Sequence, residues 1–233
     1  MGRIAATMSR IDGKRAANML EELQGSPAHV DALIKIAHLR PVDVNFIDDF
    51  KVRVQDSIED PYEQAAAYYN LALALPEVMQ DIIRTLVLEA ENWFTQKPLS
   101  AHVDEFGMRT RYEISESSLR LLKAKALLKL FQPNNNQTLA DEVMALANRA
   151  GFYRDKRLIL LSLFEHVKSW PTNAQINLLR YVLKKSVNKG LDDIQATIAA
   201  SVPVLYTMGE FALLDELWQQ VHYRTLLRKA ARM

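Results

Sequence analysis

The sequence predicts an all-α protein of 233 residues, and within that class an α-solenoid, a right-handed superhelix of stacked antiparallel helix pairs. Three observations lead to this fold class. Apolar residues recur at steps of three and four along most of the chain, which is the spacing of one face of an α-helix. Nearly all of the seven glycines fall between such stretches, where a glycine typically ends a helix. Pro133 and Pro171 both lie between predicted helices and are 38 positions apart, an interval typical of repeated helical hairpins.

The N-terminal part of the chain is expected to form five helices. The first three cover about 11–23, 28–39 and 44–58. Asp60 and Pro61 predict the start of the fourth helix, because aspartate caps a helix N-terminus and proline suits the first turn. Pro76 ends that helix and opens the fifth, which runs to about residue 94, because proline cannot donate to the preceding turn.

The C-terminal part repeats the same pattern of helices and breakers. We expect helices at 115–131, from the Pro133 segment to 150, at 153–167, from 172 to about 188, at 192–206, and from 209 to 221. Gly151, Gly190 and Gly209 follow three of them, as expected for glycine at a helix C-terminus.

Charge and periodicity divide the chain into three predicted parts: acidic helical hairpins at 1–94, an irregular connecting segment at 95–114, and basic helical hairpins at 115–233. Residues 1–110 hold 11 Lys/Arg and 17 Asp/Glu, a net charge of −6, and residues 111–233 hold 18 and 11, a net charge of +7. In the connecting segment apolar residues alternate with polar ones, which favours a short strand or hairpin. The two helical parts are expected to belong to one continuous solenoid.

Two segments carry a resemblance to known repeat families. Residues 62–76 (YEQAAAYYNLALALP) and 208–221 (MGEFALLDELWQQV) resemble the helix pairs of HEAT-like and tetratricopeptide-like repeats. The likeness extends over about 60–94 and 115–221, but the full tetratricopeptide pattern of Trp, Leu-Gly and Tyr is absent. The resemblance implies a superhelical scaffold that binds another macromolecule, and it implies no particular ligand.

No motif in the sequence supports catalysis, a cofactor or a metal. None of the five histidines lies four residues from another, so no helix presents a two-histidine metal pair. Adjacent acidic residues point in different directions on a helix and do not form an acid/base pair by themselves. There is neither a phosphate-binding glycine loop nor a Gly-x-Ser-x-Gly turn. The protein is therefore expected to be no enzyme and to need no cofactor.

The candidate partner-binding residues are Arg149, Arg180, Lys184 and Tyr68. Arg180 and Lys184 are four residues apart and lie along one helix face, where stacked repeats would align cations. Tyr68 and Tyr69 are neighbours on one helix, so one of them is expected to be exposed, and we take Tyr68 as the candidate anchor for a partner. The alternative interpretations are that the cations are ordinary solvated charges and that Tyr68 belongs to the core.

The function predicted from these observations is a non-catalytic protein-binding scaffold or adaptor. The alternative is a helical-repeat protein that binds nucleic acid through its basic half. A third hypothesis is homo-oligomerisation through the oppositely charged halves. The chain has no cysteine, which favours a reducing compartment such as the cytoplasm. It also has no run of about 18 apolar residues, so no membrane span is expected.

Overall fold

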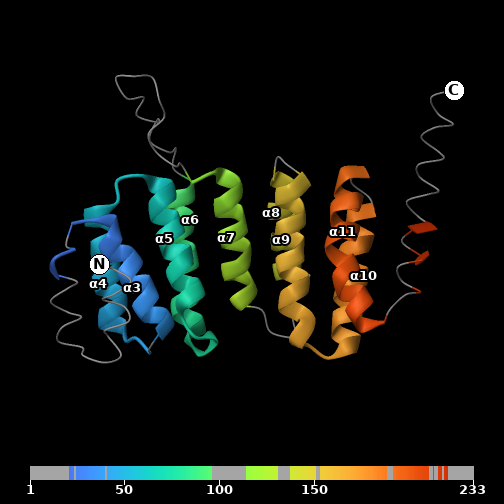
Figure 1. Ribbon diagram of the computed structural model, residues 1–233, viewed down its shortest axis with the longest axis horizontal. Helices are drawn as coiled ribbons and strands as arrows, with labels where there is room; N and C mark the ends of the chain where they lie inside the picture. Colours follow the sequence, from blue (N-terminus) through green and yellow to red (C-terminus); the bar gives the residue numbers. More distant parts are fainter. Residues whose placement is uncertain are drawn as a thin grey trace, which may run out of the picture. The chain divides into compact units, whose positions relative to one another are not determined.

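The computed structural model describes residues 21–23, 25–39, 41–95, 114–130, 137–150, 153–187 and 191–209, and residues 212, 215, 216, 218 and 219. Within these residues the protein has nine α-helices, two short 3-10 helices and no strand (Figure 1). The predicted all-α class is therefore confirmed for the described residues. The chain divides into two compact units, Met1–Leu130 and Phe131–Met233.

The first unit contains five of the described α-helices. They are α3 (Pro27–Leu39), α4 (Val44–Ser57), α5 (Pro61–Ala74), α6 (Gln80–Phe94) and α7 (Glu116–Lys129), with a 3-10 turn, η1 (Glu77–Met79), before α6. Alternate helices pack on one another, α3 on α5 and α5 on α7. Helix α4 packs on α3 and α5, and α6 packs on α5 and α7. The unit thus has two layers, with the odd-numbered helices in one and the even-numbered helices in the other.

The helix starts of this unit follow the local sequence. The Asp60 carboxylate accepts hydrogen bonds from the backbone N–H groups of Tyr62 (2.8 Å) and Glu63 (3.1 Å), and Pro61 occupies the first position of α5. Ser115 caps α7 in the same manner, accepting from the backbone N–H of Ser118. These caps satisfy amides that have no partner inside the helix.

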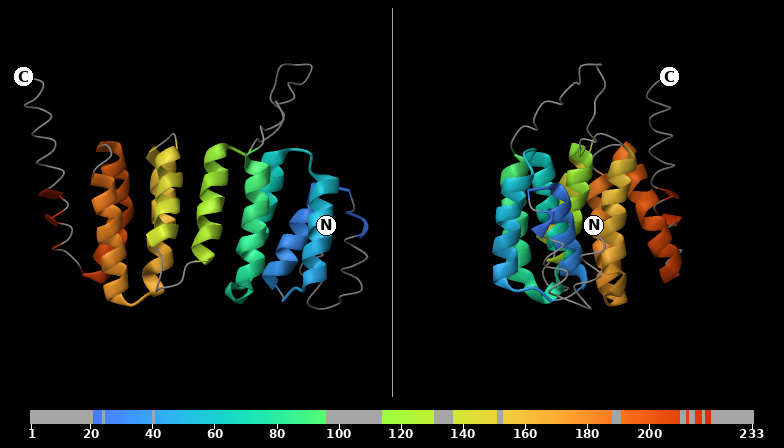
Figure 2. Two further views of the ribbon diagram at one scale, coloured as in Figure 1. Left: turned by 180° about the vertical axis from the view of Figure 1, so that it is seen from behind. Right: turned by 60° about the vertical axis from the view of Figure 1, so that its left-hand side comes forward.

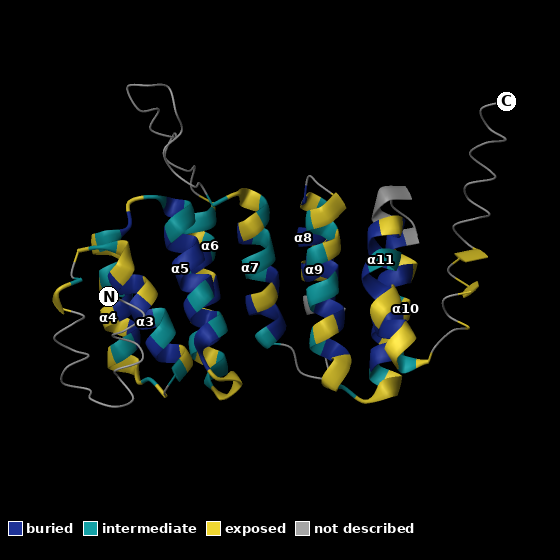
Figure 3. Ribbon diagram, in the orientation of Figure 1, coloured by how far each residue is buried: buried dark blue, intermediate teal, exposed yellow. Residues whose placement is uncertain are grey.

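Helix α5 is the centre of the first unit because four helices pack on it and none of its residues is exposed. It contacts α3, α4, α6 and α7, and Figure 3 shows mostly buried and half-buried residues along it. Its buried residues are small or aromatic and include Ala65, Ala66, Ala67, Tyr68, Tyr69 and Ala72. Small side chains allow the neighbouring helices to approach closely, and the aromatic side chains fill the remaining space.

The second unit contains four described α-helices in two antiparallel pairs. They are α8 (Gln137–Arg149), α9 (Tyr153–His166), α10 (Thr172–Val187) and α11 (Leu191–Met208), with a 3-10 turn, η2 (Val167–Ser169), after α9. Helix α8 pairs with α9 and α10 with α11, and the view from behind shows the same two pairs (Figure 2). The pairs pack through α9 on α11 and, less extensively, α8 on α10.

The described helices lie close to the ranges that the sequence predicts. Helix α11 differs, because it continues to Met208 through Pro203, and Gly209, with a φ of +72°, follows it. The predicted first helix at 11–23, the irregular segment at 95–114 and the last helix at 209–221 lie wholly or mostly outside the described residues. Helix α7 packs on α5 and α6 and so belongs to the first unit, whereas the three-part division at 95–114 stays a prediction.

Candidate functional site

The second unit has an exposed groove on its surface. It has a volume of about 520 Å³ and is lined by Tyr153, at the start of α9, by one face of α11 and by Asp215 and Trp218. A volume in this range suits a drug-sized molecule or a few side chains of a protein partner.

Helix α11 supplies the floor of the groove because it is apolar on two sides. Ile194, Ala200, Val204 and Leu205 are buried against the rest of the unit. The other side carries Gln195, Ile198, Ala199, Val202 and Tyr206, at steps of three and four. A helix with a single apolar stripe buries it in the core, so a second stripe that remains accessible is a candidate contact surface.

The exposed fractions of the groove's large side chains separate them from ordinary core residues. Tyr153 is 45% exposed, Val202 is 38% exposed and Trp218 is 70% exposed, and Tyr206, on the same stripe of α11, is 70% exposed. Large apolar and aromatic side chains that remain accessible together mark interaction sites more often than single exposed ones do.

A single carboxylate gives the groove its charge. Asp215 is the only charged residue among the described residues that line it. Asp215 has no ion pair or hydrogen bond within the described part of the chain. The groove therefore combines aliphatic and aromatic surface with one negative charge that no described residue neutralises.

The predicted cationic residues lie on α8 and α10, outside the described lining of the groove. Arg180 and Lys184 share the exposed face of α10 with Asn173 and Asn177, and neither cation has an ion pair or hydrogen bond within the described residues. Arg149 is exposed at the end of α8.

Lys185, beside these cations, is held in a small cluster of its own. The Tyr181 hydroxyl donates to Asp141 Oδ2 (2.7 Å), and the Lys185 ammonium lies 3.6 Å from Asp141 Oδ1 and 5.2 Å from the centre of the Tyr181 ring. The hydrogen bond with Tyr181 and the charge of Asp141 raise the pKa of Lys185. This cluster joins α8 to α10, so Lys185 is occupied where Arg180 and Lys184 are not.

The expected exposure of Tyr68 is wrong. Its side chain is 1% exposed and packs edge-on against Phe50, with ring centres 5.9 Å apart. Burial raises the pKa of Tyr68 to about 12. The core interpretation holds because four helices pack on α5, and both Tyr68 and Tyr69 are buried. The run of alanines beside them was the signal for a central helix, since a helix that is apolar all round is buried.

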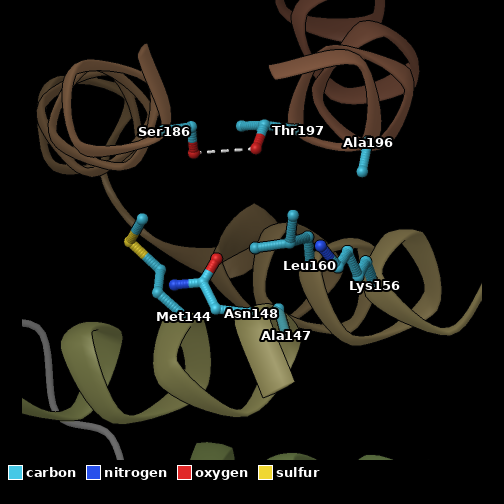
Figure 4. Close-up of a pocket in the computed structure, with 8 residues that line it drawn as sticks. All are labelled: Met144, Ala147, Asn148, Lys156, Leu160, Ser186, Ala196 and Thr197. Carbon is cyan, nitrogen blue, oxygen red and sulfur yellow. Dashed lines mark hydrogen bonds between the residues drawn. The ribbon is translucent and has the colours of Figure 1, made fainter. Parts of the chain in front are cut away.

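A small, mostly apolar cavity lies in the second unit, between α8, α9, α10 and α11 (Figure 4). The Thr197 hydroxyl donates to Ser186 Oγ (2.8 Å), and the Ser186 hydroxyl donates to the Val182 carbonyl (2.9 Å). Asn148 and Lys156 also line this space of about 10 Å³. It has room for about one water molecule and none for a substrate.

The described residues contain no group of three or more His, Asp or Glu side chains that could hold a metal ion. None of the described helices combines the length and apolar composition that a bilayer span requires.

No family model, no curated protein and no solved structure matches this chain.

The groove on α11 was missed by sequence reasoning, although the four-residue spacing of Ile198, Val202 and Tyr206 was visible. The pattern resembles that of a core face, and only the packing of α11 reveals which stripe is covered.

Proposed function

We propose that this protein is a non-catalytic scaffold or adaptor that binds another protein through the groove on α11. The observation that carries the proposal is the second apolar stripe of α11, which stays accessible beside Tyr153 and Trp218. Protein interfaces are enriched in such aromatic anchors at the centre of a desolvated patch.

The groove suits a protein segment better than it suits nucleic acid. Its described lining carries a carboxylate and no cation, and a carboxylate repels phosphate. Its stripe runs from Gln195 to Tyr206, which is about 16 Å along a helix and matches three turns of a partner helix.

We further propose that each unit is a length of α-solenoid of the helical-repeat type. The support is the packing of alternate helices, α3 on α5 on α7 in one unit and α9 on α11 in the other. In stacked hairpins each repeat covers the apolar face of its neighbour, and a preformed surface then binds with little ordering cost.

The proposal is tested by affinity capture from a lysate of the native host, with wild type and Val202→Asp as baits. A charge on the groove floor is expected to remove the captured partner, because it would be buried without a counter-ion. Val52→Asp, at an exposed valine of α4 that is 51% exposed, is the matched control and should capture as wild type does. Equal capture by Val202→Asp and wild type would refute the proposed surface.

A second candidate function is nucleic-acid binding through α10. The observation in its favour is that the exposed face with Arg180 and Lys184 has two unoccupied cations and no acid among its described residues. Arg149 would add a third contact. If this function holds, Arg180→Glu with Lys184→Glu weakens binding to DNA or RNA and makes the slope of log K against log salt shallower by about 2. Binding that is insensitive to salt and to these substitutions excludes it.

A further inference from the structure

The charge and the aromatic content of the α11 groove restrict what its occupant can be. Ile198, Ala199 and Val202 offer aliphatic surface, and Tyr153 and Trp218 offer ring surface. The faces of aromatic rings carry partial negative charge and attract cations. Asp215, three residues before Trp218 in the sequence, also lines the groove and adds a full negative charge. The carboxylate of Asp215 and the ring faces of Tyr153 and Trp218 therefore favour a positive charge over a negative one.

We propose that the groove binds an amphipathic helix of a partner protein whose apolar face includes one arginine or lysine, with that cation placed between Trp218 and Asp215. This inference rests on the proposed scaffold function and names the chemistry of its partner.

The helical form of the partner follows from the shape of the floor. The residues of the stripe recur at three and four positions over about three turns of α11. A partner helix presents side chains at the same steps, so its aliphatic residues can lie between those of α11 along the groove. A partner in extended conformation binds by pairing its backbone with the unpaired backbone groups of a strand edge. The described part of the protein has no strand, which favours a helical partner.

The positive charge follows from the state of Asp215. A carboxylate covered by an apolar partner loses its water and destabilises the complex unless a cation replaces that water. Arginine or lysine does so, and its aliphatic stem covers apolar surface at the same time. Tryptophan is the aromatic side chain that attracts a cation most strongly, so Trp218 and Asp215 favour the same group.

The test uses the full-length protein and two synthetic helical peptides. Both have about 14 residues with leucines at steps of three and four, and they differ only in one central residue, arginine or glutamate. Binding is measured by fluorescence anisotropy of labelled peptide. The arginine peptide is expected to bind about tenfold more tightly than the glutamate peptide, since a salt bridge and a cation–π contact together supply that ratio.

Two variants of the groove and one matched control variant test the expected preference for the arginine peptide. Asp215→Lys is expected to reverse the preference, so that the glutamate peptide binds more tightly. Glu165→Lys changes charge equally at an exposed residue of α9 in the same unit and should keep the wild-type preference. Trp218→Ala is expected to reduce the preference without changing the thermal unfolding temperature, because Trp218 is 70% exposed.

The outcomes separate this inference from the proposed function. If neither peptide binds, the inferred partner chemistry is wrong. If both peptides bind equally and Val202→Asp abolishes their binding, the inferred charge preference is wrong. In both cases the capture experiment alone decides whether the groove is the scaffold's binding surface. If Val202→Asp leaves peptide binding unchanged, the groove is not the binding surface and both proposals fail. If wild type is a dimer and Val202→Asp a monomer, the occupant is a second copy of the chain and the inference is wrong.

Discussion

Two tyrosines of this protein differ in the number of helices around them. Tyr68 lies on α5 among neighbours from several helices and is 1% exposed, whereas Tyr206 lies on the open stripe of α11 and is 70% exposed. The difference separates a residue that is enclosed in the core from a residue whose side chain is largely exposed.

Tyr68→Ala is expected to lower the free energy of unfolding by about 3–5 kcal/mol, because it leaves a cavity beside Phe50. Tyr206→Ala removes a side chain of the same size from an exposed position and should change stability by about 0.5 kcal/mol or less. Urea unfolding of the two variants measures both values. Similar losses from the two would contradict the assignment of Tyr68 to the core.

His29 is the buried histidine of α3. It is 4% exposed, and its Nδ1 has no hydrogen-bond partner in the described residues. Burial, with a smaller contribution from Arg53, lowers the pKa of His29, while Asp49 acts in the opposite direction. The folded protein therefore holds this imidazole neutral.

Acidification is expected to destabilise the fold through His29. Below pH 6.5 the unfolded chain takes up a proton that the folded protein still refuses, so stability is lost as the pH falls from about 6.5 toward the lowered pKa. The slope is at most about 1.4 kcal/mol per pH unit for one proton. Unfolding followed between pH 7 and 5 should show a weaker dependence in His29→Gln than in wild type.

The control for this measurement is His38→Gln, at an exposed histidine of the same helix. It should retain the wild-type dependence on pH between 7 and 5. An unchanged dependence in His29→Gln would show that His29 does not contribute.

At the scale of the elements, Lys129 connects the end of α7 to the end of α5. Its ammonium donates to the Leu75 carbonyl (2.6 Å) and to the Leu73 carbonyl, which lie at the C-terminus of α5. A cation at this position satisfies carbonyls that have no partner in the helix and complements its dipole. Burial lowers the pKa of Lys129, with Glu77 opposing.

Lys129→Met is expected to destabilise the protein by about 1.5–3 kcal/mol, the range for hydrogen bonds to a charged group. Methionine keeps most of the aliphatic volume, so the loss reports the two hydrogen bonds. Lys125→Met, at an exposed lysine of the same helix, should change stability by about 0.5 kcal/mol or less. A loss as small as that of Lys125→Met would show that the contact between the helix ends contributes little.

At the scale of the whole chain, the main feature is the uneven distribution of charge along the sequence. Residues 1–110 carry a net charge of −6 and residues 111–233 a net charge of +7. Oppositely charged parts on one chain can attract those of a second copy, and salt screens that attraction.

If the chains associate through these charges, the weight-average mass measured by light scattering is expected to be higher at low ionic strength than at high ionic strength. Arg180→Glu with Lys184→Glu changes the net charge of residues 111–233 from +7 to +3 and should reduce the effect. A mass that is independent of salt would exclude association of this kind.

The sequence by itself determined which segments are helical. Asp60, Pro61 and Pro76 mark boundaries through hydrogen bonds and dihedral limits that act within a few residues, and the helices begin and end close to those positions. The periodic apolar residues between the breakers predicted the same helices, because one helix face must be buried wherever the helix lies. These signals are local, so they needed no knowledge of neighbouring helices.

Only the tertiary structure decided which apolar faces remain accessible. Tyr68 and Val202 both belong to apolar stripes with helical spacing, yet one is buried and the other lines a groove. The physical reason is that exposure depends on how many helices surround a residue: four pack on α5, whereas the described part of the second unit leaves one side of α11 uncovered. Spacing along one helix defines a helix face, so the sequence could place the predicted cations on a shared face. The groove depends on which neighbours cover α11, so the sequence could not predict it.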